Sequence, residues 1–115
     1  MSLDPEIERT ILQCVNEVLR TLGKSEAQTF FSYVARDLHL RKKDIPRKPE
    51  QFSKALKMVF GEKAANVLEN AIVQKLLASH GINRKTKLTL AGGIIIVKAE
   101  REKSSKGFRH INTHL

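Results

Sequence analysis

The chain has 115 residues, of which 41% are hydrophobic, enough for one folded domain with a single core and too many for a wholly disordered protein. Lys and Arg number 21 against 12 for Asp and Glu, and the resulting net charge of +9 favours polyanionic partners. A single cysteine, Cys14, permits no internal disulfide and predicts a reducing, cytoplasmic location. The most apolar run, residues 88–97, is about half as long as a membrane-spanning helix, so no membrane contact is expected.

Four segments show the apolar spacing of amphipathic helices. Asp4 suits the start of the first helix, and Gly23 suits its end. A capping pattern over residues 25–28 opens the second helix, and the prolines within residues 41–49 predict a loop before the third. We predict helices at residues 4–22, 25–39, 49–60 and 62–80.

The last of these helices is expected to organise the fold. It has the longest apolar-rich pattern, and Leu68, Ile72 and Leu76 share one broad face. Val73 and Leu77 interrupt its polar side, so this side also needs cover, either from the rest of the chain or from a second subunit. The helix should therefore lie at the centre of the core.

Short motifs between residues 22 and 82 resemble a known family. They are Leu22-Gly23, Asp44-Ile45-Pro46, Lys48-Pro49-Glu50-Gln51-Phe52, Ala55-Leu56, Phe60-Gly61, Leu68-Glu69, Ile72 and Leu76. The set is similar to the small helical archaeal (thaumarchaeal) output domain that often follows phosphoacceptor receiver domains. This resemblance implies a non-enzymatic, all-helical output or interaction module. No receiver domain accompanies the motifs in this sequence, and the basic segment after Gly81 lies outside the matched region.

The pattern changes after Gly81. Residues 87–90 and 94–99 favour β-structure and flank a Gly92-Gly93 pair, which predicts a short β-hairpin. A helix continuing to Glu102 is the alternative, disfavoured by the two adjacent glycines. The expected organisation is a mainly α, compact four-helix domain with a central C-terminal helix and a hairpin over residues 1–99. A basic, flexible tail follows over residues 100–115.

No catalytic or metal-binding constellation stands out. Carboxylates such as Glu17, Asp37 and Glu69 fall singly on outward helical positions, whereas acid or base catalysis needs titratable groups that converge. His110 and His114 are four residues apart but lack acidic or cysteine co-ligands at suitable spacing. We therefore expect no enzyme, no metal, no cofactor and no small-molecule substrate.

Two functional hypotheses remain open. The first is an output or interaction module of an archaeal signalling system, with a protein partner or self-association through Val73, Leu77, Ile94 and Ile96. The second is nucleic-acid binding, either in a winged-helix-like arrangement or through non-specific phosphate contacts. Residues 81–115 carry eight of the 21 basic side chains and only two of the 12 acidic ones. The candidate nucleic-acid contacts are Arg41, Lys42, Lys43, Arg47, Lys48, Arg84, Lys85, Lys87, Lys98, Arg101, Lys103, Lys106 and Arg109.

Overall fold

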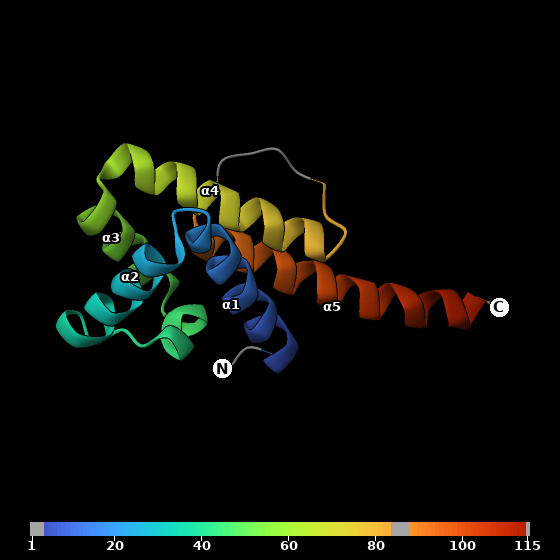
Figure 1. The fold of residues 1–115 in the computed structure, drawn as a ribbon. Coiled ribbons are helices and arrows are strands. Elements are labelled where there is room, and N and C mark those ends of the chain that lie inside the picture. The colour runs from blue at the N-terminus through green and yellow to red at the C-terminus, as the bar shows by residue number, and fades with distance from the viewer. Residues whose placement is uncertain (1–3, 84–87, 115) are drawn as a thin grey trace.

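Five α-helices and one 3-10 helix make up the described part of the chain, which contains no strand (Figure 1). The computed structural model describes the backbone of residues 4–83 and 88–114 and the side chains of residues 4–83 and 88–102. The mainly helical class predicted from the sequence is confirmed. In chain order the elements are α1 (Pro5–Arg20), α2 (Lys24–Asp37), the 3-10 helix η1 (Lys42–Arg47), α3 (Pro49–Phe60), α4 (Glu62–Ser79) and α5 (Leu90–His114).

Helix α4 lies at the centre of the fold, where it contacts α1, α3 and α5 (Figure 1). Its residues Ile72 and Leu76 are completely buried, and Leu68 is 8% exposed. Burial of these aliphatic side chains against three neighbouring helices supplies much of the hydrophobic stabilisation of the domain. The central position predicted for this helix is confirmed.

Local chemistry explains where the helices begin and end. Asp4 caps α1, because its Oδ1 atom accepts a hydrogen bond of 2.7 Å from the backbone N–H of Glu6. Helix α2 starts one residue earlier than the predicted capping pattern, with Gly23 at the N-cap position and no side-chain capping bond. The predicted loop at residues 41–49 contains η1 and the first residue of α3. Gly61 has a φ of 85°, which favours glycine and allows the tight corner between α3 and α4.

The structure has a helix where the sequence pattern predicts the second strand of a hairpin. Residues 94–99 lie inside α5, and Lys87, where the expected first strand begins, lies outside the described residues. A Cβ atom added at Gly93 would lie 3.0 Å from Cγ1 of Val73 on α4. The glycine therefore allows α5 to approach α4 closely, which outweighs the low helix propensity of the Gly92-Gly93 pair.

Helix α5 continues without a break across the predicted boundary at residue 99. Its backbone is helical as far as His114 and projects beyond the end of α4 (Figure 1). The longest dimension of the molecule is accordingly 54 Å, compared with 27 and 21 Å in the other two directions. Mobility of residues 100–115 stays a prediction.

Candidate nucleic-acid interface

The first basic cluster of the sequence lies on η1, which is anchored to the body of the protein. Ile45 and Pro46 are buried, and η1 packs against both α1 and α3. The apolar pair fixes the backbone, while the flanking cations at Arg41, Lys43 and Lys48 remain exposed. A short, anchored turn of this kind presents charge in a defined position.

Two of the five cations of this cluster are bound within the chain. The Lys42 ammonium donates a hydrogen bond of 3.1 Å to Oδ1 of Asn16 and lies 4.6 Å from the ring centroid of Phe31. Nε of Arg47 donates to Oε2 of Glu8 at 3.0 Å. The hydrogen bond and the charge of Glu8 raise the pKa of Arg47 above its ordinary value. Each of these two cations is already held by a partner.

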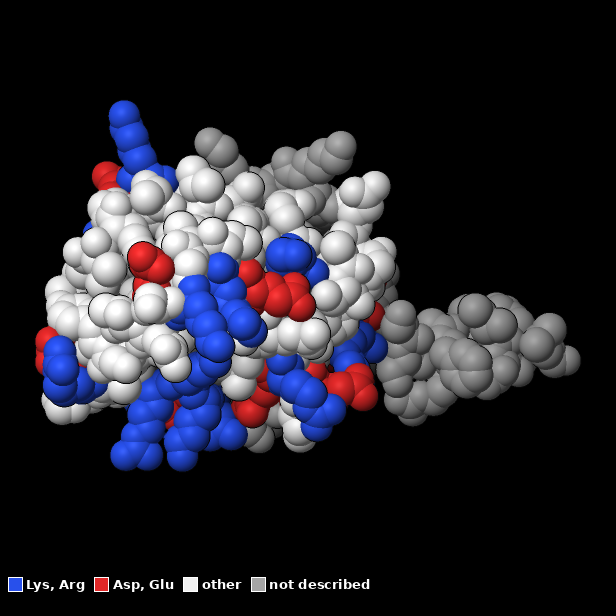
Figure 2. All heavy atoms as spheres, in the orientation of Figure 1, with Lys and Arg blue, Asp and Glu red and all other residues white. Residues whose placement is uncertain are grey.

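The remaining three cations of the cluster are free to bind another molecule. Arg41, Lys43 and Lys48 are exposed and have no hydrogen-bond or ion-pair partner among the described side chains. Figure 2 shows Lys and Arg side chains gathered along the lower edge of the molecule, in the region where η1 lies in Figure 1. We define these three residues as the η1 patch. The patch concentrates positive charge without a compensating carboxylate partner.

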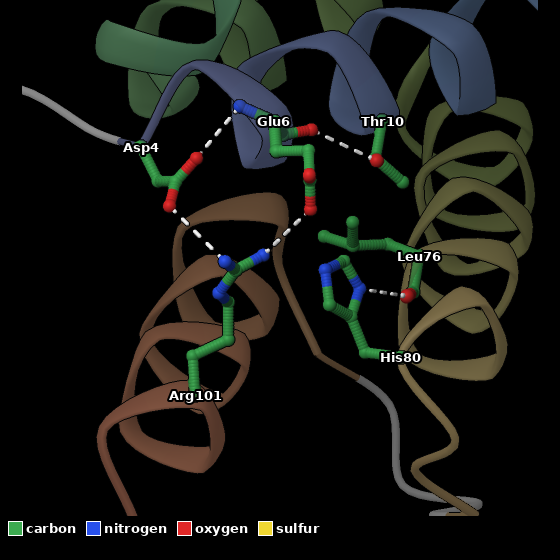
Figure 3. Close-up of polar contacts among 6 residues, drawn as sticks. All are labelled: Asp4, Glu6, Thr10, Leu76, His80 and Arg101. Carbon is green, nitrogen blue, oxygen red and sulfur yellow. Dashed lines mark hydrogen bonds and ion pairs between the residues drawn. The ribbon is translucent and has the colours of Figure 1, made fainter. Parts of the chain in front are cut away.

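The candidate contacts on α5 do not join the η1 patch. Lys98 is exposed, whereas Arg101 is held by two carboxylates at the start of α1 (Figure 3). Its guanidinium lies 3.2 Å from Oδ2 of Asp4 and 3.1 Å from Oε1 of Glu6. Arg84, Lys85 and Lys87 lie outside the described residues, as do the side chains of Lys103, Lys106 and Arg109, whose backbone belongs to α5.

The start of α1 separates these two basic regions. Its acidic residues bind cations on both sides, since Glu8 pairs with Arg47 of η1 while Asp4 and Glu6 pair with Arg101 of α5. These exposed ion pairs contribute little stability on their own. Because of these pairs, Arg47 and Arg101 must each lose a carboxylate partner before they can bind a phosphate.

The expected interaction surface is largely buried within the chain itself. Val73 and Leu77 are 0% exposed and Ile94 is 6% exposed, while Ile96 is half-buried against the core. The prediction that Val73 and Leu77 need cover is met by α5, which packs on α4. In the described structure these residues are therefore not a free surface for a partner.

The prediction that Glu69 lies on an outward helical position is wrong. Glu69 is 4% exposed, and its carboxylate accepts hydrogen bonds from the Ser53 hydroxyl on α3 and, at 2.6 Å, from the backbone N–H of Leu90 at the start of α5. Thr89 completes this helix start, because its Oγ1 accepts from the N–H of Gly92 at 3.1 Å. Glu69 thus ties three helices together. In the sequence, Thr89 before the apolar run that starts at Leu90 is typical of a helix N-cap. The prediction of a β-hairpin assigned the same residues to a strand and therefore missed this helix start.

Replacing Glu69 with alanine is expected to destabilise the fold. The change leaves the Leu90 N–H without its acceptor, at a cost of roughly 1–3 kcal/mol, whereas the Ser53 hydroxyl keeps the Pro49 carbonyl oxygen as an acceptor at 3.2 Å. Glu69→Gln is the matched control, because the amide keeps one oxygen acceptor and should cost less. Urea unfolding of both variants measures the difference. Equal stability of Glu69→Ala and the unaltered chain would contradict the assigned role.

Cys14 is expected to react slowly with thiol reagents. The residue is 4% exposed, and burial raises the pKa of its thiol above the ordinary value. A raised pKa lowers the thiolate fraction at a given pH, and the thiolate is the reactive form. Alkylation by iodoacetamide at pH 8 should therefore be slower by about tenfold or more in the folded chain than in denaturant. Equal rates in the two conditions would show that the thiol is accessible.

A second surface feature lies between α2 and α3. Here an open hollow of about 870 Å³ is bordered by the half-buried rings of Tyr33 and Phe60 and by Met58 and Val59, which are 62% and 40% exposed. Ser25, Gln28 and Thr29 supply polar groups from the α2 side. Exposed aliphatic side chains beside a concave surface are typical of protein contacts.

Comparison with protein-family models, with curated proteins and with solved structures finds no match for this chain. The resemblance of residues 22–82 to the archaeal output domain therefore stays a prediction. None of the helices in the described residues is long and apolar enough to cross a membrane. Within the same residues, no group of three or more His, Cys, Asp or Glu side chains is arranged to hold a metal ion.

Proposed function

We propose that this chain is a non-enzymatic binding module that holds the phosphate backbone of nucleic acid on the η1 patch. The observation that carries the proposal is the set of three exposed cations, Arg41, Lys43 and Lys48, which have no partner among the described side chains. A net charge of +9 strengthens the long-range attraction of the whole chain for a polyanion. Lys and Arg side chains on an anchored turn are suited to phosphate oxygens.

The η1 patch is better suited to contacts with backbone phosphates than to sequence-specific contacts with bases. In a winged-helix arrangement, α4 would be the helix that enters the major groove of DNA. In the structure, α4 instead packs against α1, α3 and α5. The segment expected to form the wing is helical over residues 94–99. Phosphate contacts position a protein on nucleic acid without distinguishing one sequence from another. We therefore expect similar affinity for unrelated sequences of equal length.

A salt series tests the proposed function. Binding of the chain to labelled duplex and single-stranded oligonucleotides of several sequences is measured by fluorescence anisotropy at increasing salt concentration. Release of condensed counterions predicts that the logarithm of the association constant falls linearly with the logarithm of the salt concentration. Binding that is absent at low salt, or that is insensitive to salt, would refute the proposal.

The second candidate is a protein-interaction module of an archaeal signalling system, working in the cytoplasm. It is supported by the family resemblance and, on the surface, by the hollow between α2 and α3 with its exposed Met58 and Val59. A protein partner bound there should be lost in a Met58→Glu variant and retained in a variant of the η1 patch. Affinity-capture experiments with the two variants in parallel distinguish this candidate from nucleic-acid binding.

A further inference from the structure

One cation of η1 is held by a carboxylate of α1 instead of being left for a ligand. Nε of Arg47 donates a hydrogen bond of 3.0 Å to Oε2 of Glu8, and the side chain of Arg47 is 60% exposed. Arg47 directly precedes Lys48 in the chain and shares η1 with Lys43, so it borders the η1 patch. Guanidinium groups are the side chains best matched to phosphate oxygens. Arg47 would therefore extend the patch if Glu8 did not occupy it.

The contact between Glu8 and Arg47 is fixed by the packing of the two elements that carry it. Ile7, which precedes Glu8 on α1, is 3% exposed, and Ile45, on η1 with Arg47, is completely buried. Helices α1 and η1 pack against each other, and the side chain of Glu8 is only 19% exposed. The carboxylate therefore stays next to the guanidinium because the backbone is anchored on both sides of the pair.

The carboxylate of Glu8 reduces what Arg47 offers to a phosphate. A carboxylate and a phosphodiester are both anions that accept charge-assisted hydrogen bonds from the same N–H groups, so they compete for the guanidinium. The negative charge of Glu8 also repels a phosphate that approaches Arg47. Arg41, Lys43 and Lys48 have no carboxylate partner among the described side chains. The attraction of Arg47 for phosphate is therefore opposed from within the chain, whereas that of the η1 patch is not.

We propose that Glu8 is an internal competitor for phosphate, which withholds Arg47 from the nucleic-acid interface and so limits the affinity of binding at the η1 patch. This inference rests on the proposed function and adds the residue that sets its strength. An ion pair between partly exposed side chains contributes little to stability, so the pair is not needed to hold the fold together. Its main effect falls on binding, because each phosphate contact that is prevented also prevents the release of condensed counterions.

The variant Glu8→Gln tests the competition. Its amide keeps an oxygen that can accept from Nε of Arg47, so the change removes the charge of the carboxylate with little change of shape. Binding to duplex DNA is measured by fluorescence anisotropy over a salt series. One additional phosphate contact should steepen the slope of log affinity against log salt by about 0.9. For equal affinities at about 1 M salt, this slope gives roughly eightfold tighter binding of the variant at about 0.1 M.

Two control variants separate a released cation from a change of net charge. Glu6→Gln makes the same change in the same first turn of α1, but Arg101, the partner of Glu6, stays paired with Asp4 (Figure 3). This control releases no cation and should leave the slope unchanged. The double variant Glu8→Gln, Arg47→Gln has the net charge of the unaltered chain. Its slope should return to that of the unaltered chain, because the gain depends on Arg47.

The outcomes distinguish this inference from the proposed function. An unaltered chain that does not bind nucleic acid refutes the proposed function, and the inference with it. An unaltered chain that binds with the same slope as Glu8→Gln overturns the inference alone. Equal gains in Glu8→Gln and Glu6→Gln, or a gain that persists without Arg47, would also overturn it, because net charge would then explain the result. Weaker binding by Glu8→Gln would show that Glu8 orients Arg47 toward phosphate, which is the opposite role.

Discussion

Replacing Ile72 with alanine is expected to lower the free energy of unfolding by roughly 2–5 kcal/mol. Ile72 is 0% exposed and lies midway along α4, the helix that contacts α1, α3 and α5. The change removes buried methyl and methylene groups and leaves a cavity that packed helices cannot fully close. For a domain of this size such a loss is a large fraction of the total stability. Urea unfolding followed by circular dichroism gives the value directly.

Val67→Ala on the same helix is the control for this experiment. Val67 is 69% exposed, so its truncation removes little buried surface and should change the stability by no more than about 0.5 kcal/mol. Both changes place alanine in α4, and any general gain in helix propensity is therefore shared. If the two variants lost similar amounts of stability, α4 would not be the central helix of the core.

The positions of the first four helices could be predicted because their signals are local. Asp4 and Pro5 stand at the start of α1, and Pro49 stands at the start of α3. Between such markers the apolar residues recur at helical spacing, which is sufficient to define the buried face of each helix. The ends differ from prediction by no more than two residues, as at Arg20, where α1 stops before the predicted residue 22.

Helix α5 could not be predicted in the same way, because tertiary contacts determine it. Residues 94–97 are β-branched, and two glycines precede them, so local propensity favours a turn and a strand. In the fold, Gly93 faces Val73 at close range, and Glu69 of α4 binds the Leu90 N–H at the start of α5. Neither contact is visible in a one-dimensional pattern, since Glu69 and Leu90 are separated by 21 residues. Packing against α4 here overrides propensity.

The candidate binding residues could likewise be predicted only in part. A cluster of cations around Asp44 and Pro46 is plain from the sequence, and the structure places it on η1. Which of those cations are already bound is not plain, because Asn16 and Glu8 approach Lys42 and Arg47 from α1. A sequence pattern can therefore locate a charged segment, while only the fold separates its free charges from its paired ones.

Removing the η1 patch is expected to weaken nucleic-acid binding and to flatten its salt dependence. In the triple variant Arg41→Gln, Lys43→Gln, Lys48→Gln, three cations without a partner among the described side chains are lost, and each can release about 0.9 of a counterion from duplex DNA. The slope of log affinity against log salt should thus fall in magnitude by up to roughly three. Binding should weaken to a similar degree for every sequence, and the stability of the fold should hardly change, because exposed charges contribute little to it.

A second triple variant, Lys54→Gln, Lys57→Gln, Lys63→Gln, makes the control for net charge. These three lysines are also exposed and lie on α3 and α4 rather than η1. Both variants carry the same total charge, so a purely long-range attraction would weaken equally in the two. A contact at the η1 patch predicts that only the first variant shows the fall in slope of up to roughly three. Equal slopes for the two variants would show that binding follows net charge alone, and an unchanged slope in the first variant would remove η1 from the interface.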